Sequence, residues 1–366
     1  MKGVADVVVV GAGPAGACTA LALQRKGLST TLIDRSPQPR WKIGETLAPE
    51  ATAVLERIGA ASVFQGGGHL RSNGVASAWG AAMLHNSEFI FRPEGCGWQL
   101  DRPRFERALI DAACRAGASL MTGQNVLAMR RQHHGWEVKT SGGIVSAAHL
   151  VDASGSARVV ARRLRLRHVA IDRLVSLHFR LSGALNPDRD THTLVESVPD
   201  GWWYTALVPG GARIVSLQTD ADLLAKDSWR KDEWMHGQIR STRNLFDLLG
   251  SRGYRLIVVP SLVSARSSRL ERFFGEGWIA VGDAAMTVDP LCGRGIFMAM
   301  QTAVMAADAI ATAGAHAMEA YGVALEHAWN DYLQGRCVYY QAEMRWSDRP
   351  FWQRRHRSDF RAAEVR

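Results

Sequence analysis

Apolar residues gather near the start of the chain in a run of four valines, Val7 to Val10. A short, continuous apolar run beside turn residues is typical of a strand that is buried on both faces. The periodic segment 17–26 follows and predicts a helix, and the apolar run 30–33 predicts a second strand. Strand, helix and strand in this order indicate an α/β protein with a parallel sheet.

Between residues 169 and 263 the pattern changes to longer runs in which apolar and polar residues alternate. Alternation with a period of two predicts antiparallel strands, and therefore a second and separate sheet. Helical segments interrupt this region between residues 221 and 249. The strands expected outside the first sheet are 74–79, 88–91, 174–181, 193–198, 202–208, 214–219 and 254–263.

The remaining periodic segments complete this organisation. Helices are expected at 49–58 and 102–116, with short strands at 126–130, 136–140, 144–146 and 150–152. After the alternating region, the apolar run 278–283 predicts one more buried strand. Two long helices, at 295–313 and 317–346, close the chain.

The turn after the valines, Gly11 to Gly16, reads G-A-G-P-A-G, and Asp34 ends the second strand. This spacing matches the fingerprint of dinucleotide-binding folds, with an acidic residue about twenty positions on. Gly11 permits the tight turn, Gly13 lets backbone N–H groups approach a pyrophosphate, and Gly16 lets helix and strand pack closely. Because Asp34 is placed to bind a ribose, the pattern predicts a dinucleotide site.

Charge adds a second feature to an otherwise ordinary composition. The chain has 366 residues, of which 47% are hydrophobic and 22% charged, and its formal net charge is +9. The segment 345–366 holds seven arginines and three acidic residues, a net +4, and a second basic cluster lies at 158–167. Such clusters are solvated helix faces or sites for an acidic partner or a phosphate. No recognition motif accompanies them, so no nucleic-acid partner is predicted.

Cysteine usage and apolar segments bear on the compartment. Five cysteines stand far apart without a C-x-x-C pair, which argues against a disulfide framework and a zinc site; no metal site is predicted. Glycines break the N-terminal apolar run, and Gln301 and Asp308 interrupt the run 296–313. We therefore expect a cytoplasmic protein in which 296–313 is a buried helix and not a membrane span.

Two further pieces accompany the glycine turn. Asp152-Ala153-Ser154-Gly155 follows one predicted strand, and Gly282-Asp283-Ala284-Ala285 follows another and leads to the loop 289–296. In this order and at these separations, the pieces resemble the FAD-dependent hydroxylase superfamily, in the branch that holds flavin halogenases, geranylgeranyl reductases and related monooxygenases. The resemblance covers nearly the whole chain.

The resemblance implies a Rossmann-type, GR2-like FAD domain with an antiparallel substrate-domain sheet and a helical C-terminal part. The FAD domain would comprise 1–72, 101–168 and 271–315, the substrate domain 73–100 and 169–270, and the C-terminal helical segment 316–366. The residues implied to contact FAD are Gly11, Gly13, Pro14, Ala15, Gly16, Asp34, Arg35, Glu45, Thr46, Arg104, Val126 through its backbone, Gly282, Asp283, Pro290, Gly293, Gly295 and Ile296.

The resemblance implies that the loop 289–296 lies close to the flavin ring. Gly293 and Gly295 have no Cβ, so the backbone can approach the ring, and the helix from Ile296 points its positive end at the anion that reduction creates. Arg294 either adds charge there or is a surface arginine. Cys292 is either a reactive thiol or a small buried side chain.

Two observations speak to the branch of the superfamily. Halogenases of this kind carry a lysine near the active site and a W-x-W-x-I-P motif, whereas this chain has no lysine between Glu45 and Phe91 and reads G-W-W-Y-T-A-L-V-P at 201–209. The segments 44–49, 98–102, 201–204 and 343–352 resemble flavoprotein maturases of tryptophylquinone enzymes. Those proteins hydroxylate a tryptophan inside a partner polypeptide.

The resemblance thus implies an FAD-dependent monooxygenase that hydroxylates a peptidyl tryptophan of a partner protein during tryptophylquinone cofactor biogenesis. Reduced nicotinamide, NADH or NADPH, would be the transient donor and molecular oxygen the co-substrate, although a separate reductase fits equally. A small-molecule flavin hydroxylase or halogenase and a geranylgeranyl-reductase-like flavin reductase stay open as alternatives.

Three side chains are candidates for the chemistry. Glu45 would orient the substrate or move protons, or it is simply a carboxylate favoured at a helix N-terminus. On a strand, Trp202 and Tyr204 share one face and Trp203 points to the other, so one face would line an aromatic pocket. The basic aromatic tail, with Trp346 and Trp352, would dock the protein substrate or pack on the body of the protein.

Overall fold

The run of valines forms the centre of the first sheet. The computed structural model describes residues 5–62, 66–224, 228–255 and 260–357. In it, β1 (Ala5–Val10) lies between β2 (Thr30–Ile33) and β11 (Gly143–Asp152) and runs parallel to both. Val10 pairs with Ile33 on one side and with Asp152 on the other. The carboxyl ends of three strands therefore meet beside the glycine turn.

The first sheet has eight strands in the order β19-β20-β11-β1-β2-β8, and β10 and β9 extend it from β11. The pairs from β20 to β8 are parallel, whereas β9, β10 and β19 join in antiparallel fashion. The bounds of the strands not yet given are Ser119–Met121 for β8, Val126–Gln132 for β9, Gly135–Thr140 for β10, Phe274–Gly275 for β19 and Trp278–Ala280 for β20.

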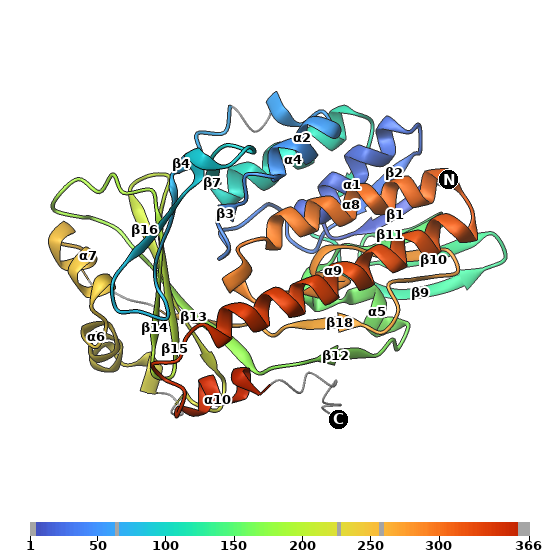
Figure 1. Cartoon of the computed structure of the whole chain (residues 1–366). Coiled ribbons are helices and arrows are strands. Elements are labelled where there is room, and N and C mark those ends of the chain that lie inside the picture. The colour runs from blue at the N-terminus through green and yellow to red at the C-terminus, as the bar shows by residue number, and fades with distance from the viewer. Residues whose placement is uncertain (1–4, 63–65, 225–227, 256–259, 358–366) are drawn as a thin grey trace.

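Helices rich in small residues pack against this sheet. α1 (Pro14–Arg25) begins with proline at its first position and contacts α4 (Arg102–Arg115) and α8 (Gly295–Thr312). Figure 1 shows α1 and α8 side by side, with α9 (Ala315–Gln341) running along α8. Within the described ranges, α8 is the one helix long and apolar enough to cross a membrane, and half of it is buried in the protein.

The second sheet has seven strands in the order β17-β13-β16-β15-β14-β5-β6. Its pairs are antiparallel, as predicted, except that β5 and β14 run parallel. The strands are β5 (Gly74–Ala78), β6 (His85–Glu88), β13 (Leu174–Leu181), β14 (Thr193–Val198), β15 (Gly201–Val208), β16 (Ala212–Asp220) and β17 (Ser261–Ser264). This sheet joins segments from two distant parts of the chain. We call it the substrate sheet.

The two faces of the substrate sheet are covered differently. α6 (Asp232–Arg240) and α7 (Asn244–Arg252) lie over the outer face, where Trp203 packs with Met235 and Leu245. Trp202 belongs to another cluster with Tyr340 and Trp352 of the C-terminal part. α10 (Pro350–His356) follows α9 and contacts it. The α/β architecture with a helical C-terminal part is therefore confirmed.

Two small sheets and two short helices complete the fold. β3 (Thr46–Leu47), β7 (Gly97–Gln99) and β4 (Leu70–Ser72) form one sheet. The other consists of β12 (His168–Ala170), β18 (Ser268–Leu270) and β21 (Met286–Thr287). The helices are α2 (Ala51–Arg57) and α5 (Val159–Arg163).

Three predicted elements differ from the structure. The strand expected at 88–91 is a 3-10 turn over Phe89–Phe91, because Phe89 turns inward beside Gly97 while Ile90 and Phe91 face solvent. The pieces expected at 144–146 and 150–152 form one long strand, β11. The predicted strand 254–263 falls partly outside the described residues, and its visible part is β17.

The last helix ends five residues earlier than predicted, at Gln341. Glu343 turns inward there and accepts hydrogen bonds from the backbone N–H groups of Gly80 and Arg345 and from the hydroxyl of Ser197. These bonds compete with continuation of the helix. Pro350 then opens α10, where its missing N–H costs nothing.

Candidate active site

The glycine turn has the geometry that a dinucleotide needs. A Cβ on Gly11, whose φ is +105°, would lie 2.4 Å from the carbonyl oxygen of Ala153, and one on Gly16 would lie 1.8 Å from that of Gly11. Both contacts are with backbone, so neither position accepts a side chain. Gly13 instead faces open space, and no side chain caps the N-terminus of α1. The free N–H groups in the first turn of α1, including that of Ala15, are thus available to a phosphate.

Asp34 holds the turn and faces a cleft. Its Oδ2 accepts a hydrogen bond from Ala12 N at 2.7 Å, and its Oδ1 accepts one from Ser36 N at 2.7 Å. The open cleft has a volume of about 430 Å³, and Gly13, Asp34 and the exposed Arg35 are among its lining residues. Each carboxylate oxygen can accept a second hydrogen bond, so a ribose fits beside Asp34.

Two residues that the resemblance implies to contact FAD are not among those that line this cleft. Arg104 points toward Asp101, with its Nε 3.5 Å from the carboxylate. Val126 is buried, and its carbonyl oxygen accepts a hydrogen bond from Arg163. Arg107 and Asn125, each within three residues of one of them in the chain, do line the cleft.

Gly282 and Asp283 lie at the end of β20, next to the glycine turn. Gly282 has a φ of +56°, and its N–H donates to Thr302 Oγ1 at 2.9 Å. A Cβ there would lie 3.0 Å from that of Ala15. The Asp283 side chain is exposed, yet desolvation by the surrounding protein raises its pKa, while Arg158 and Arg102 lower it.

Arg158 shows that the second basic cluster is not all solvated. Its side chain is buried, and its guanidinium donates to the carbonyl of Ala284 and to the hydroxyl of Ser268. It therefore braces the segment that carries Asp283. Arg162 and Arg163 of the same cluster stay at the surface.

The loop 289–296 presents bare backbone at the N-terminus of α8. Gly293 and Gly295 are exposed, and a Cβ on either would meet no atom within 4 Å. Pro290 is exposed, Ile296 is buried, and no side chain caps the helix. An eighteen-residue helix thus points uncapped N–H groups into free space. The shape and donors fit a flavin ring that becomes anionic on reduction.

Contacts bear on the two alternatives in this loop. Arg294 forms an ion pair with Glu50 at 2.5 Å and lies over the ring of Phe297. Its guanidinium thus lies at the surface and has a carboxylate partner. The Cys292 side chain is partly buried. Desolvation raises the pKa of its thiol to about 12, so the thiol stays protonated at neutral pH.

Glu45 is the unusual carboxylate of the site. It is 1% exposed; its Oε2 accepts a hydrogen bond from Gly44 N at 3.1 Å, and its Oε1 has no hydrogen-bond partner among the described residues. Burial raises its pKa to about 7, against the opposing charges of Arg102 and Arg180. A group of this kind can take up and release a proton near neutral pH.

Arg102 neutralises the surroundings of Glu45 without binding it. Its guanidinium donates to the carbonyls of Ile43 and Gly44 and pairs with Glu106 at 2.5 Å. Lys42 pairs with the same Glu106 at 2.9 Å. The segment before Glu45 is thereby held against α4.

Tyr204 of the substrate sheet comes to the same place. Its hydroxyl lies 2.9 Å from Thr46 Oγ1, and Thr46 donates to Gln99 Oε1 at 3.0 Å. Burial and the nearby charge of Glu45 raise the pKa of Tyr204. The structure therefore brings Glu45, Thr46 and Tyr204 together.

A family model described as "FAD binding domain" matches residues 4–321. The chain belongs to this FAD-binding family. It is 28% identical over 365 residues to LodB of Marinomonas mediterranea, described as an FAD-dependent oxidoreductase, with 96% of each chain covered. The chain is a flavin-dependent oxidoreductase of the halogenase and hydroxylase superfamily.

Two solved structures of this superfamily have the same fold. The flavin-dependent halogenase CmlS superposes with a TM-score of 0.85 and 23% identity, covering 97% of this chain and 68% of that one. The peptidyl tryptophan dihydroxylase QhpG, essential for tryptophylquinone cofactor biogenesis, superposes with a TM-score of 0.77 and 26% identity. The match covers 96% of this chain and 79% of the QhpG chain.

Trp202 lies in a buried aromatic cluster, against which Tyr204 and Leu291 also pack. The predicted alternation is present, but Trp202 is 1% exposed and packs among Trp79, Tyr340 and Trp352. Its Nε1 donates to the Tyr340 hydroxyl at 3.1 Å. In this FAD-binding protein Trp202 fills the core between the substrate sheet and the C-terminal helices, and does not line an open pocket.

The basic aromatic tail turns toward the substrate sheet. Four of its arginines pair with carboxylates: Arg345 with Glu343, Arg349 with Asp200, Arg354 with Asp220 and Asp222, and Arg355 with Asp220. Trp352 is fully buried and donates its Nε1 hydrogen to the carbonyl of Val198. Up to residue 357 the tail therefore packs on the body, and the rest of it lies outside the described residues.

Proposed function

We propose that the protein is an FAD-dependent monooxygenase that hydroxylates an aromatic ring, and that the ring is a tryptophan within a partner polypeptide. The observation that carries the proposal is the buried Glu45, which lies beside Thr46 and Tyr204. It has a pKa of about 7 and a carboxylate oxygen with no hydrogen-bond partner among the described residues. FAD, when reduced in the presence of molecular oxygen, supplies the oxygen atom that adds to the ring.

Glu45 then has a definite task. When the ring carbon gains an oxygen atom it must lose its hydrogen as a proton for aromaticity to return, and Glu45 Oε1 accepts that proton. Its raised pKa makes the carboxylate a competent base that can pass the proton on near neutral pH. Tyr204 and Thr46 provide hydroxyl groups beside it that orient the ring.

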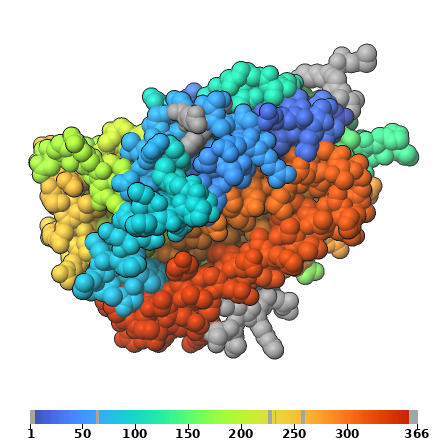
Figure 2. Space-filling model, turned by 45° about the horizontal axis from the view of Figure 1, so that its top comes forward, coloured from blue at the N-terminus to red at the C-terminus, as the bar shows by residue number. Residues whose placement is uncertain are grey.

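The similarity to the peptidyl tryptophan dihydroxylase QhpG supports a polypeptide substrate. The surface offers a suitable docking region, the rim surface, formed by Ile90, Phe91, Val338 and Tyr339. Ile90 and Phe91 are 82% and 85% exposed. Figure 2 shows the surface hollowed between the cyan segment near residue 90 and the red-orange helix α9. Exposed apolar side chains on these two segments suit an apolar peptide.

The distribution of charge also supports the rim surface, and not the basic tail, as the docking site of the partner polypeptide. Between residues 332 and 344 the only charged residues are Arg336 and Glu343, and both are buried. The end of α9 and the residues just after it therefore turn their charges inward and expose apolar side chains, the reverse of an ordinary surface helix. The partner's docking segment is accordingly apolar and largely uncharged.

The remaining components follow from the proposal. A reduced nicotinamide, NADH or NADPH, or a reductase supplies the two electrons, and molecular oxygen is the co-substrate. The missing lysine between Glu45 and Phe91 supports hydroxylation over halogenation. Five free cysteines support a reducing compartment such as the cytoplasm.

The proposal is tested by giving the reduced holoenzyme three substrates in separate reactions with oxygen: the unmodified precursor of a tryptophylquinone enzyme, free tryptophan, and free tryptophan with bromide. We expect oxygen to be added to the precursor alone. Efficient bromination would favour the halogenase alternative, and vigorous hydroxylation of free tryptophan would favour a small-molecule hydroxylase. Reoxidation by an alkene without oxygen would favour the reductase.

A further inference from the structure

Three side chains on one face of α9 contact the first residue of the loop 289–296. Tyr332, Arg336 and Tyr340 are spaced four residues apart, so they lie on one face of the helix. All three contact Asp289, the first residue of the loop 289–296. The Tyr332 hydroxyl accepts from Asp289 N at 3.0 Å, the Tyr340 hydroxyl donates to Asp289 Oδ2 at 2.8 Å, and Arg336 Nε lies 3.5 Å from that oxygen.

Asp289 in turn holds the next residues of the loop. It is 1% exposed, and its Oδ1 accepts from Leu291 N at 3.0 Å, which caps the 3-10 turn Pro290–Cys292. Gly293 and Gly295 follow that turn directly. A carboxylate held from both ends fixes where the uncapped N–H groups of α8 point, and hence where they meet the flavin.

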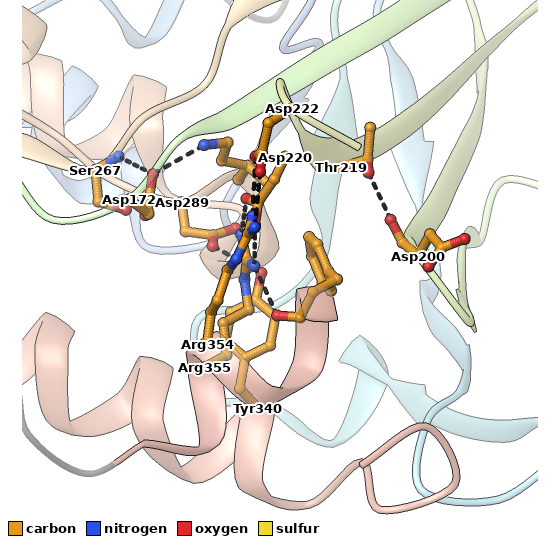
Figure 3. Close-up of polar contacts among 12 residues, drawn as sticks. Asp172, Asp200, Thr219, Asp220, Asp222, Ser267, Asp289, Tyr340, Arg354 and Arg355 are labelled. Atoms are coloured by element: carbon orange, nitrogen blue, oxygen red, sulfur yellow. Dashed lines mark hydrogen bonds and ion pairs between the residues drawn. The ribbon is translucent and has the colours of Figure 1, made fainter. Parts of the chain in front are cut away.

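Tyr340 is itself immobilised. Its ring is fully buried between two guanidinium groups, those of Arg336 at 5.0 Å and Arg355 at 5.2 Å. Figure 3 shows Tyr340 and Asp289 in one cluster with Asp172, Asp220 and Arg355. The hydroxyl receives the Trp202 Nε1 hydrogen at 3.1 Å and donates its own to Asp289. One hydroxyl thus connects the substrate sheet, the C-terminal helix and the flavin loop.

We propose that Tyr340 is a positioning residue for the flavin, which acts by holding Asp289 and through it the loop 290–295, and that Trp202 orients the Tyr340 hydroxyl for this role. Trp202, a predicted catalytic residue, would thereby act on the flavin loop only through Tyr340 and Asp289. The inference requires FAD binding only, so it stands or fails independently of the peptidyl tryptophan substrate.

The physical consequence concerns the reduced flavin most. Burial raises the pKa of Asp289, and the Arg336 charge opposes this. Without the Tyr340 hydroxyl, the carboxylate loses its shortest donor and the loop loses its fixed geometry. The N–H groups at α8 then stabilise the anionic ring less well, so reduced FAD loses more affinity than oxidised FAD does.

The test is Tyr340→Phe, with Tyr321→Phe as the matched control. Tyr321 is also buried on α9, but its hydroxyl donates to Ala280 O in the first sheet. The readouts are FAD dissociation from the holoenzyme, followed by flavin fluorescence on dilution, and the midpoint potential of the bound flavin. We expect Tyr340→Phe to raise the FAD Kd about tenfold, as for loss of a hydrogen bond to a charged group, and to shift the potential to a more negative value.

A double-mutant cycle separates positioning from general destabilisation. Trp202→Phe keeps a ring but removes the N–H group, so it should raise the FAD Kd by itself, yet add little in the Tyr340→Phe background. The inference is overturned if Tyr340→Phe leaves the potential unchanged, if Tyr321→Phe shifts it equally, or if the two effects of the cycle add fully. Should Tyr340→Phe fail to fold, Tyr332→Phe tests the same hold on Asp289 and must shift the potential in the same direction.

Discussion

Tyr204 and Thr46 are joined by a hydrogen bond of 2.9 Å although 158 positions separate them in the chain. Tyr204 comes from the substrate sheet, and Thr46 directly follows Glu45, whose segment is anchored on α4 through Arg102. This contact brings the substrate sheet against the flavin-binding part of the protein. The buried carboxylate of Glu45 lies at that junction, and it is the group on which the proposed chemistry depends.

Replacement of Glu45 by glutamine should remove the proton acceptor and leave FAD binding intact. We expect the rate of hydroxylation to fall by about 10²–10⁴-fold, the usual contribution of a positioned base. Because the base form is required and the pKa is about 7, the wild-type rate should rise with pH through about 7 and then level off. The variant should lack this rise. A wild-type rate that falls as pH increases through this range would contradict the role.

Gly13 and Gly16 should respond differently to alanine. At Gly16 a Cβ would lie 1.8 Å from a carbonyl oxygen, so Gly16→Ala should destabilise the fold by several kcal/mol, as overpacking does, about 3 kcal/mol or more. At Gly13 the space is open, so Gly13→Ala should fold normally and weaken FAD binding by about tenfold. Urea unfolding and flavin fluorescence distinguish the two. Equal stability losses would show that Gly13 is also a packing position.

Asp220 should be far more important for stability than Asp222, two residues away. Asp220 accepts hydrogen bonds from the buried Arg355 and from Arg354, whereas Asp222 meets Arg354 at the surface. We expect Asp220→Asn to cost about 3–5 kcal/mol, because it leaves Arg355 buried without its partner charge, and Asp222→Asn to cost under about 1 kcal/mol.

The pH dependence of the same pair has a defined sign. The hydrogen bonds and charges of the two arginines hold the folded-state pKa of Asp220 below its ordinary value, although burial opposes them. Its contribution to stability is therefore present above the unfolded pKa of 3.8 and is lost as pH falls through the lower folded value. Urea unfolding at several acidic pH values checks this, and a stability difference between wild type and Asp220→Asn that grows on acidification would contradict it.

The rim surface should matter for the partner polypeptide alone. Phe91→Ser should raise the KM for a polypeptide substrate by about tenfold, as loss of an interface anchor does, with little change in FAD binding. Phe246→Ser provides a control, because Phe246 is an exposed phenylalanine on α7, on the outer face of the substrate sheet. Identical KM values for the two variants would remove the rim surface as the docking site.

Local patterns predicted the flavin-binding half of the protein well. The valine strand, the glycine turn and the Asp283 turn each depend on a few consecutive residues, so their geometry can be read from the chain. The sequence also showed that Trp202 and Trp203 face opposite ways, because strand periodicity determines this. It did not show what covers either face.

Contacts between distant segments account for what the sequence could not predict. The pairing of Arg355 with Asp220 joins residues 135 positions apart, and it turns a tail that looks basic into a packed segment. Arg158 was expected on a solvated helix face or at a site for an acidic partner or a phosphate, and it is buried beside Ser268. Only the folded chain reveals which charges find partners, since composition counts charges without placing them.

The most direct test of the central claim is a single turnover under isotopically heavy oxygen gas. The reduced holoenzyme would be mixed with the unmodified precursor of a tryptophylquinone enzyme, and its tryptophan-containing peptide analysed by mass spectrometry. The account predicts that the peptide gains heavy oxygen on the tryptophan ring in the wild type and gains far less in Glu45→Gln. A peptide that acquires no heavy oxygen, while flavin is reoxidised and free aromatic compounds or alkenes are consumed, would contradict it.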